Sequence, residues 1–305
     1  MKLIRDVEFA YIRSINKTRL RKILASFFAF IGLLWTIIEI AEYFFGDFLE
    51  SVKLKAIIGN NFLYIVALLL LVSAHIHRKR RKIERCIKNT DIKITVEYCD
   101  IFNQKGAVII SGIDTFDTDI PNGLVSPRTL HGKLVSTFYA ERVDQLDKEI
   151  KSSLEKSGET PLEINESLPG KKARYRIGTT VLLRPEGRTI YFMALSSMQA
   201  NKNGAINPEN IGIVLSNVWE YICEFGIYHD VVNIPVIATG KKKLPGHITN
   251  QYMVYEIINS FILRTIEKPI CRNLRICLRD PDGSRYNLET VGGFIDSMNE
   301  YLALK

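Results

Sequence analysis

Residue types that build metal centres and disulfide frameworks are scarce in this sequence. The 305 residues include five cysteines and five histidines. The cysteines contain no Cys-x-x-Cys pair, and their odd number fits a reducing cytosol better than a disulfide framework. The histidines form no His-Glu-x-x-His motif, so a zinc site has no support and we expect neither a metal nor a cofactor. No internal repeat is present.

Excess basic charge is also missing from most of the chain. The formal net charge is +8, from 41 Lys and Arg against 33 Asp and Glu. Sixteen of these basic residues and seven of the acidic ones precede residue 89, which leaves 25 basic and 26 acidic residues in 89–305. Because the excess lies beside apolar segments, we expect no nucleic-acid partner. Such basic flanks suit the anionic inner leaflet of a bilayer.

Two long apolar segments, at about 23–45 and 56–76, dominate the N-terminal part. Each reaches the roughly 20 residues that a helix needs to cross a hydrocarbon core about 30 Å thick. The stretch 62–72 contains no charged residue. The pattern predicts a two-helix transmembrane hairpin with basic flanks over residues 1–88, in contact with the lipid bilayer.

The charges beside the two segments predict the orientation of the hairpin. Residues 1–22 hold seven Lys and Arg, and residues 77–88 hold seven more. Basic residues close to a span stay in the cytoplasm. We therefore expect a multi-pass protein with both termini cytoplasmic and 46–55 as the only outside loop. A cleaved signal peptide is disfavoured, because the first span is too long and a second follows directly.

Four polar residues lie toward the outer ends of these segments: Glu39, Glu42, Asn60 and Asn61. In an antiparallel hairpin they would share one depth. Two interpretations stay open, solvation in the interface and hydrogen bonding between helices or subunits.

Residues 89–305 show strands and helices in alternation, which indicates a sheet between helices. We expect residues 82–88 to continue the second span as a helix up to this cytoplasmic domain. The polar segment 157–172 is predicted to be an exposed loop. The predicted strands are 92–98, 107–111, 179–183, 189–195, 231–238 and 273–278, and the predicted helices are 126–156, 208–225, 250–265 and 288–301.

Ligands of such sheets bind beyond the carboxyl ends of the strands, and three segments there carry suitable chemistry. After the first strand, Asp100 can accept a hydrogen bond from an amine and Ile101 follows it, although a surface Asp that starts a turn is the alternative. After the second strand, a Gly-containing end leads to a helix start whose free amides attract phosphate. The residues expected there are Ser111, Gly112, Asp114, Ser126, Arg128 and Thr129.

The third segment, 234–243, follows a later strand. Small residues let a backbone close around a diphosphate, and lysines can neutralise it. The expected contacts are Ala238, Thr239, Gly240, Lys241 and Lys242, with Lys243 beside them. A solvated, charged turn is the alternative for the lysines.

Together these segments resemble a macro domain over roughly residues 92–304. The run 99–102 (Cys-Asp-Ile-Phe) resembles the Gly-Asp-Ile-(Thr/Phe) motif of that family, which puts Asp100 at its adenine-contacting position. The run 234–240 resembles the diphosphate loop. The resemblance implies a three-layer α/β/α domain with a mixed central sheet. Two departures weaken hydrolase chemistry: the run 112–114 (Gly-Ile-Asp) replaces the usual asparagine turn, and the glycine run ahead of the first long helix is missing.

Two spans followed by such a domain, with the run 126–132 (Ser-Pro-Arg-Thr-Leu-His-Gly), resemble the membrane effector of type II Thoeris anti-phage systems. The resemblance implies a bacterial inner-membrane protein without enzymatic activity. Its macro domain would bind an ADP-ribose derivative, a histidine conjugate made by a TIR-domain partner enzyme. Self-association and membrane disruption would follow. The alternatives are a non-catalytic scaffold and a membrane-anchored ADP-ribosyl hydrolase or phosphatase, with Asp114, Asp117 or His131 as acid or base.

Overall fold

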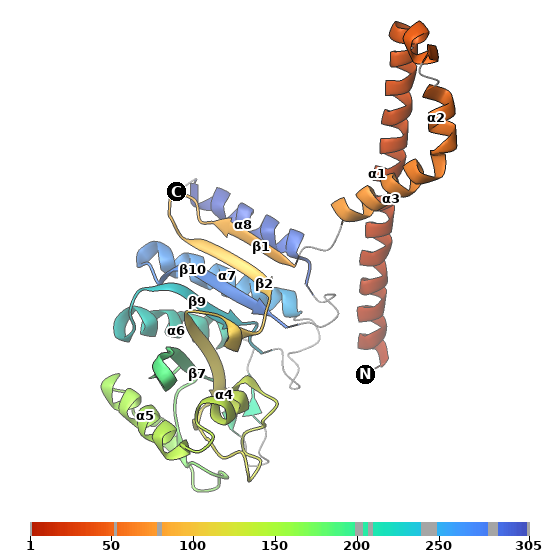
Figure 1. Ribbon diagram of the computed structural model, residues 1–305. Coiled ribbons are helices and arrows are strands. Elements are labelled where there is room, and N and C mark those ends of the chain that lie inside the picture. The colour runs from red at the N-terminus through yellow and green to blue at the C-terminus, as the bar shows by residue number, and fades with distance from the viewer. Residues whose placement is uncertain are drawn as a thin grey trace. The chain divides into compact units, whose positions relative to one another are not determined.

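The chain divides into two compact units, Met1–Arg80 and Arg81–Lys305 (Figure 1). The computed structural model describes residues 2–51, 54–77, 81–198, 204–206, 210–238, 249–279 and 286–303. The boundary expected after residue 88 therefore comes too late. Residues Lys82–Cys86 form strand β1 of the second unit's sheet, so the prediction that 82–88 continue a helix is wrong.

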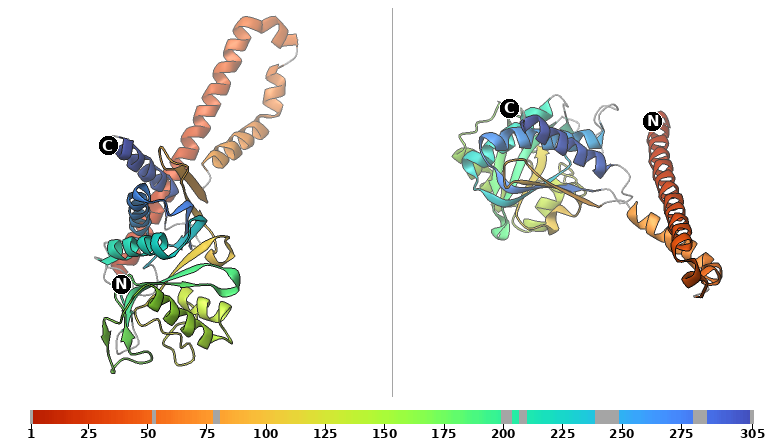
Figure 2. Two further views of the ribbon diagram at one scale, coloured as in Figure 1. Left: turned by 90° about the vertical axis from the view of Figure 1, so that its left-hand side faces the viewer. Right: turned by 90° about the horizontal axis from the view of Figure 1, so that it is seen from above.

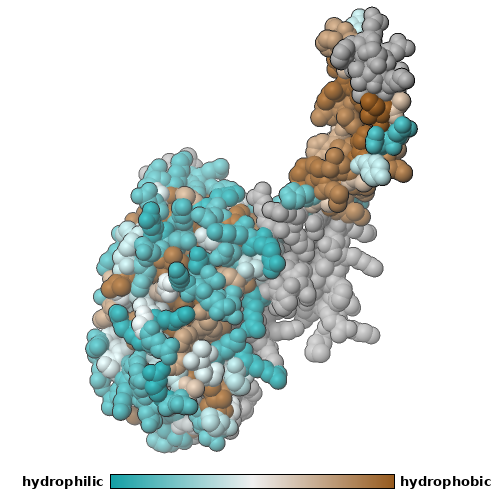
Figure 3. Space-filling model, viewed as in Figure 1, coloured by the Kyte–Doolittle hydropathy of each residue, from teal (hydrophilic) through white to brown (hydrophobic). Residues whose placement is uncertain are grey.

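The first unit is helical throughout its described length. It consists of α1 (Lys2–Ser51), which has one non-helical residue at Phe45, α2 (Leu54–Asn60) and α3 (Phe62–Ile76). Two stretches, Leu20–Gly46 and Ala56–Ile76, are long and apolar enough to cross a membrane, and they match the expected spans. Figure 3 shows apolar side chains covering the described part of these helices. Almost none of this apolar surface is buried by protein.

Some polar side chains among the described residues of the first unit make local hydrogen bonds. Trp35 donates to Glu39 four residues on (2.8 Å), and the Asn61 amide donates to the Ile57 carbonyl (2.8 Å). Each of these two bonds lies within one segment, and hydrogen bonding between helices or subunits stays a prediction. A hydrogen bond between Ser26 Oγ and His77 Nε2 (2.7 Å), near the basic flank, joins α1 to the residue that follows α3.

The second unit is built on a mixed sheet in the order β1-β2-β10-β9-β3-β7-β6. The inner strands β2, β10, β9, β3 and β7 are parallel, and β1 and β6 are antiparallel at the edges. A two-residue strand β8 (Gly204–Ala205) pairs with the end of β7. The bounds are β2 (Lys93–Tyr98), β3 (Ala107–Ile113), β6 (Thr180–Leu183), β7 (Ile190–Met198), β9 (His229–Pro235) and β10 (Cys271–Leu278).

Helices cover both faces of this sheet, which confirms the three-layer α/β/α prediction (Figures 1 and 2). Alternate residues of a strand point to opposite faces. Ile109 of β3 packs in the core with α6, α7 and α8, whereas its neighbours Val108 and Ile110 pack with α4 and α5. The bounds are α4 (Leu130–Phe138), α5 (Val143–Lys156), α6 (Ile211–Phe225), α7 (Asn250–Glu267) and α8 (Leu288–Ala303).

The helix expected over 126–156 is in fact two helices, α4 and α5. Thr129 rather than Ser126 caps the first, by accepting a hydrogen bond from the Gly132 amide (3.0 Å). Helix α4 ends at Tyr139, which is buried and donates to Glu149 of α5 (2.8 Å). The contact of the buried Tyr139 with Glu149 holds α5 folded back against the end of α4. The expected loop 157–172 also contains strand β4 (Glu163–Ile164), which pairs with β5 (Ala173–Arg174).

Side chains from helices cover backbone groups at both edges of the sheet. At β1, Asn299 of α8 donates to the Cys86 carbonyl (3.0 Å) and accepts from the Lys88 amide (3.0 Å). At β6, Ser153 of α5 accepts from the Leu182 amide (2.7 Å). Each contact occupies a backbone group that an edge strand otherwise leaves unpaired.

Candidate functional site

The parallel strands end along one edge of the sheet, as expected for a ligand site. Tyr98 at the end of β2 lies opposite Leu278 of β10, and Pro235 of β9 lies opposite Cys277. The sheet therefore brings the segments after β2, β3 and β9 to one edge. This edge is the candidate site.

Asp100 follows β2 at the surface of this edge. One of its carboxylate oxygens accepts a hydrogen bond from the Phe102 amide (3.0 Å) and so caps the short helix η1 (Ile101–Asn103). Ile101 is buried beside it. The cap fixes the position of an exposed carboxylate, which is the arrangement that a hydrogen bond to an amine requires.

The end of β3 is packed too tightly for any residue larger than glycine at Gly112. A Cβ there would lie 2.3 Å from the Phe192 ring and 3.3 Å from Nδ1 of His131. His131, on the first turn of α4, thus lies directly against the strand end. The register of β3 with β7 shifts after Gly112, and Ser111 before it is half-buried.

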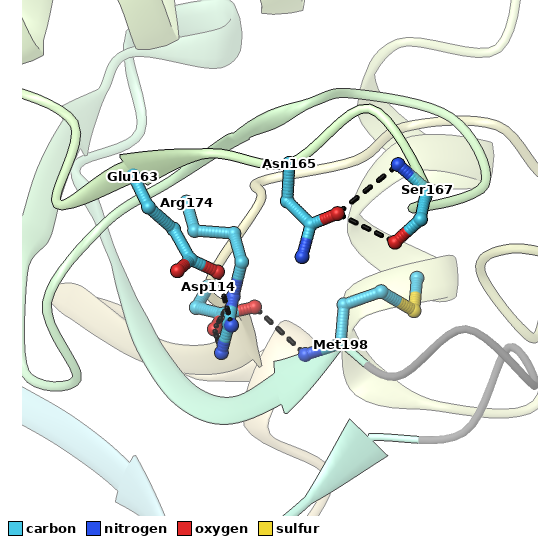
Figure 4. A network of polar contacts seen from close by, with 6 residues as sticks. All are labelled: Asp114, Glu163, Asn165, Ser167, Arg174 and Met198. Atoms are coloured by element: carbon cyan, nitrogen blue, oxygen red, sulfur yellow. Dashed lines mark hydrogen bonds and ion pairs between the residues drawn. The ribbon is translucent and has the colours of Figure 1, made fainter.

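Asp114 holds this strand end in place, as Figure 4 shows. It is buried, and its Oδ2 accepts hydrogen bonds from Arg174 Nε (3.0 Å) and Nη2 (2.8 Å). Its Oδ1 accepts from the Met198 amide (2.8 Å). Arg174 also binds Glu163 (2.6 Å) across the β4–β5 hairpin. Protein donors thus hold both oxygens of Asp114, which gives this carboxylate a structural role at the end of β3.

The other two acid or base candidates are also buried. Asp117 accepts hydrogen bonds from the Lys171 amide (2.8 Å) and the Asp119 amide (3.2 Å). Burial lowers the pKa of His131 to about 4, which the backbone of Asp117 partly opposes, so the ring is neutral at pH 7. Its Nε2 has no hydrogen-bond partner among the described residues. Asp114 and Asp117 are thus both buried carboxylates that already accept hydrogen bonds from protein donors.

The turn before α4 places Ser126, Arg128 and Thr129 at the surface. Thr129 donates to the Ser126 carbonyl (2.7 Å), which lies over the first turn of the helix. A Cβ on Gly132 would lie 2.1 Å from that carbonyl oxygen, so glycine is required here too. The turn before α4 therefore leaves the side chains of Ser126, Arg128 and Thr129 exposed, and their contact with phosphate stays a prediction.

Ala238 ends the described part of the segment after β9. It is buried and adopts a φ of +60°, a left-handed conformation that glycine takes more readily. The chain therefore turns sharply there. The other expected contacts in this segment, Thr239, Gly240, Lys241 and Lys242, lie outside the described residues.

Two residues of this edge were not predicted from sequence. Arg174 lies just after the loop expected at 157–172, and no local pattern links it to Asp114. Phe116 adopts a φ of +47° and packs between Tyr175 and Phe192. A buried aromatic residue in that conformation is uncommon and marks a backbone held by its surroundings.

Comparisons with known proteins identify the second unit. No curated protein matches the chain. Among solved structures, a mutant of the Oceanobacillus iheyensis macrodomain has a TM-score of 0.48 and 11% identity, over 72% of this chain and 100% of that chain. The same macrodomain with ADP gives 0.48 and 11%, over 71% and 97%. The macro domain of ganglioside induced differentiation associated protein 2 gives 0.38 and 10%, over 61% and 77%.

The family model described as "Thoeris protein ThsA, Macro domain" matches residues 94–279, which is more than half of the chain. The matched range begins in β2 and ends just after β10, so it includes β3, β7, β9, β10 and most of β2. The chain belongs to the family of Thoeris ThsA proteins that carry a macro domain.

Proposed function

We propose that this chain is a membrane-anchored sensor whose macro domain binds an ADP-ribose-derived signal without hydrolysing it. The signal would be histidine–ADP-ribose made by a TIR-domain enzyme. Binding would promote self-association, and the N-terminal helices would then disrupt the bacterial inner membrane, with both termini in the cytoplasm. The observation that carries the proposal is the ThsA macro-domain match in a chain with two apolar helices.

Three features of the candidate site support binding at this edge. Asp100 presents a fixed, exposed carboxylate for an adenine amine. The turn before α4 exposes Arg128 and Thr129 at a helix N-terminus, which favours phosphate. Ala238 turns the chain sharply after β9, in the segment that resembles a diphosphate loop.

The burial and hydrogen bonding of the candidate acid and base residues favour a binding protein over the alternative, an ADP-ribosyl hydrolase. A general base must reach the proton that it abstracts. Asp114 and Asp117 are buried and already accept hydrogen bonds from protein donors, and His131 is enclosed. This burial and these hydrogen bonds support binding rather than activation of water.

Calorimetry of the full-length protein in detergent tests the binding step. ADP-ribose and histidine–ADP-ribose should bind, the conjugate more tightly, and chromatography should recover both unchanged after long incubation. Adenosine serves as the control ligand that lacks the diphosphate. Hydrolysis of either compound would reject the non-catalytic proposal, and absence of binding by both would reject the sensor.

Co-expression with the TIR-domain enzyme tests the membrane step. Cells with both proteins should take up a membrane-impermeant dye, and a variant lacking residues 1–76 should prevent uptake while it still binds the conjugate. Dye uptake without the TIR-domain enzyme, or with the truncated variant, would contradict the proposed order of events.

A further inference from the structure

Cys99 and Cys277 lie side by side at the candidate edge. Strands β2 and β10 pair in parallel with Glu97 opposite Cys277. Side chains two residues apart on a strand share a face, so Cys99 continues the face of Glu97. Arg275 of β10 forms an ion pair with Glu97 (2.8 Å), so Arg275 lies on that face as well. Cys277, two residues after Arg275, shares the face. Cys277 belongs to a buried core cluster against which Cys99 packs, and the two thiols are close enough to shift each other's pKa.

The two thiols differ in ways that suit sequential oxidation. Cys99 is half-buried, and its contact with Cys277 lowers its pKa, against the opposing effects of burial and of Glu97. Cys277 is buried, and the contact with Cys99 together with burial raises its pKa, so it keeps its proton. The thiolate is the form of cysteine that reacts with peroxide, and a neighbouring thiol can then resolve the product.

We propose that Cys99 and Cys277 form a modification site, a dithiol that peroxide oxidises to a disulfide joining β2 to β10. The Cys99 thiolate attacks one peroxide oxygen, the O–O bond breaks, and sulfenic acid and hydroxide result. The Cys277 sulfur then attacks the Cys99 sulfur, loses its proton, and releases the sulfenic oxygen as water. In total two thiols and one hydrogen peroxide give one disulfide and two waters.

The disulfide acts on the ligand edge through the next residue along the chain. Asp100 follows Cys99 directly and caps η1. A bond between the ends of β2 and β10 restrains the segment that carries Asp100, and restraint of a binding segment changes affinity. This consequence rests on the proposed function, whereas the thiol chemistry does not.

Peptide mass mapping of the full-length protein in detergent tests the modification. After treatment with hydrogen peroxide and alkylation, a peptide pair joined through Cys99 and Cys277 should appear and should disappear with dithiothreitol. In Cys277→Ser, dimedone should instead label Cys99 as sulfenic acid. Cys86→Ser removes an exposed cysteine and should leave the cross-link unchanged. Oxidation at Cys86 or Cys223 with Cys99 and Cys277 both still alkylatable would overturn the proposal.

Calorimetry with ADP-ribose then tests the coupling to the ligand edge. The Kd of the reduced and the oxidised wild type should differ by at least about threefold, and the Kd of Cys277→Ser should not respond to peroxide in that way. Equal Kd values for a protein that mass mapping shows to be cross-linked would overturn the coupling. A reduced protein that does not bind would instead contradict the proposed function, and the cross-link is then judged by mass mapping alone.

Discussion

Arg174 donates two hydrogen bonds to one carboxylate oxygen of Asp114, a residue sixty positions earlier in the chain. The Asp114 carboxylate is buried at the end of β3, while about a quarter of the Arg174 side chain is exposed. The contact therefore ties the β4–β5 hairpin to the strand end beside the candidate site. An acid that looks catalytic in the sequence thus serves to hold this edge together.

Replacing Arg174 by Ala should destabilise the second unit by about 3 kcal/mol, because it leaves a buried carboxylate without its partner. Denaturant unfolding followed by Trp fluorescence measures the change. Arg142→Ala is the matched control, since it breaks an ion pair with Glu186 in which both side chains are exposed, and it should cost less than about 1 kcal/mol. Equal effects of the two variants would contradict the structural role of Asp114.

His131 should make the stability of the protein depend on pH. Its pKa is about 4 when folded and near 6.5 when unfolded, so between these values the unfolded chain binds more protons. Its contribution is constant above about pH 7 and is lost as the pH falls from 6.5 to 4, by roughly 3 kcal/mol in total. The unfolding free energies of wild type and His131→Gln should therefore differ less at pH 4.5 than at pH 7.5. A constant difference would show that burial does not keep the ring neutral.

Two substitutions of Asp100 should distinguish its role in ligand binding from its role in local stability. Asp100→Asn keeps a side-chain oxygen for the Phe102 amide but removes the charge, and it should weaken ADP-ribose binding about tenfold or more with little change in unfolding. Asp100→Ala also removes the cap, so it should lose up to about 1 kcal/mol of stability as well. Wild-type affinity in Asp100→Asn would reject the contact with adenine.

Ala238 should tolerate glycine but not valine. Its φ of +60° costs a residue with a Cβ about 1–2 kcal/mol, and glycine would avoid this cost. Glycine would, however, lose about 0.5–1 kcal/mol of stability, because it is more flexible than alanine in the unfolded chain. Ala238→Gly should therefore leave the unfolding free energy equal or slightly higher. Ala238→Val should lower it by more than about 1 kcal/mol, since a β-branched residue is poorly suited to this conformation. Similar stability of the two variants would show that the turn can relax.

Strands that consist of a continuous apolar run could be predicted from the sequence. The apolar runs of β3 and β9 are buried on both faces, which is typical of inner parallel strands, and both lie where they were expected. The strand ends that carry Asp100, Gly112 and Ala238 were placed correctly for the same reason. The α/β prediction depended on these runs.

The errors arose where one pattern fits two structures. Ile83 and Ile87 are four residues apart, a spacing that puts two side chains on one face of a helix and equally on one face of a strand. Both are buried, and pairing with β2 decides in favour of the strand. The break after α4 contains neither glycine nor proline. It depends on Tyr139, whose contact with Glu149 exists only once α5 has folded back.

The contacts of Asn299 and Ser153 restrict how copies of this chain can join. Pairing of sheets between molecules needs a row of vacant backbone donors and acceptors along an edge strand. Here a side-chain amide holds the last carbonyl of β1 and the amide beyond it, and a serine oxygen holds an amide of β6. Neither border of the sheet is open along its whole length to a strand from a second molecule. Clusters of this protein would therefore grow through helix faces, loops or spans rather than through a continuous amyloid-like ribbon.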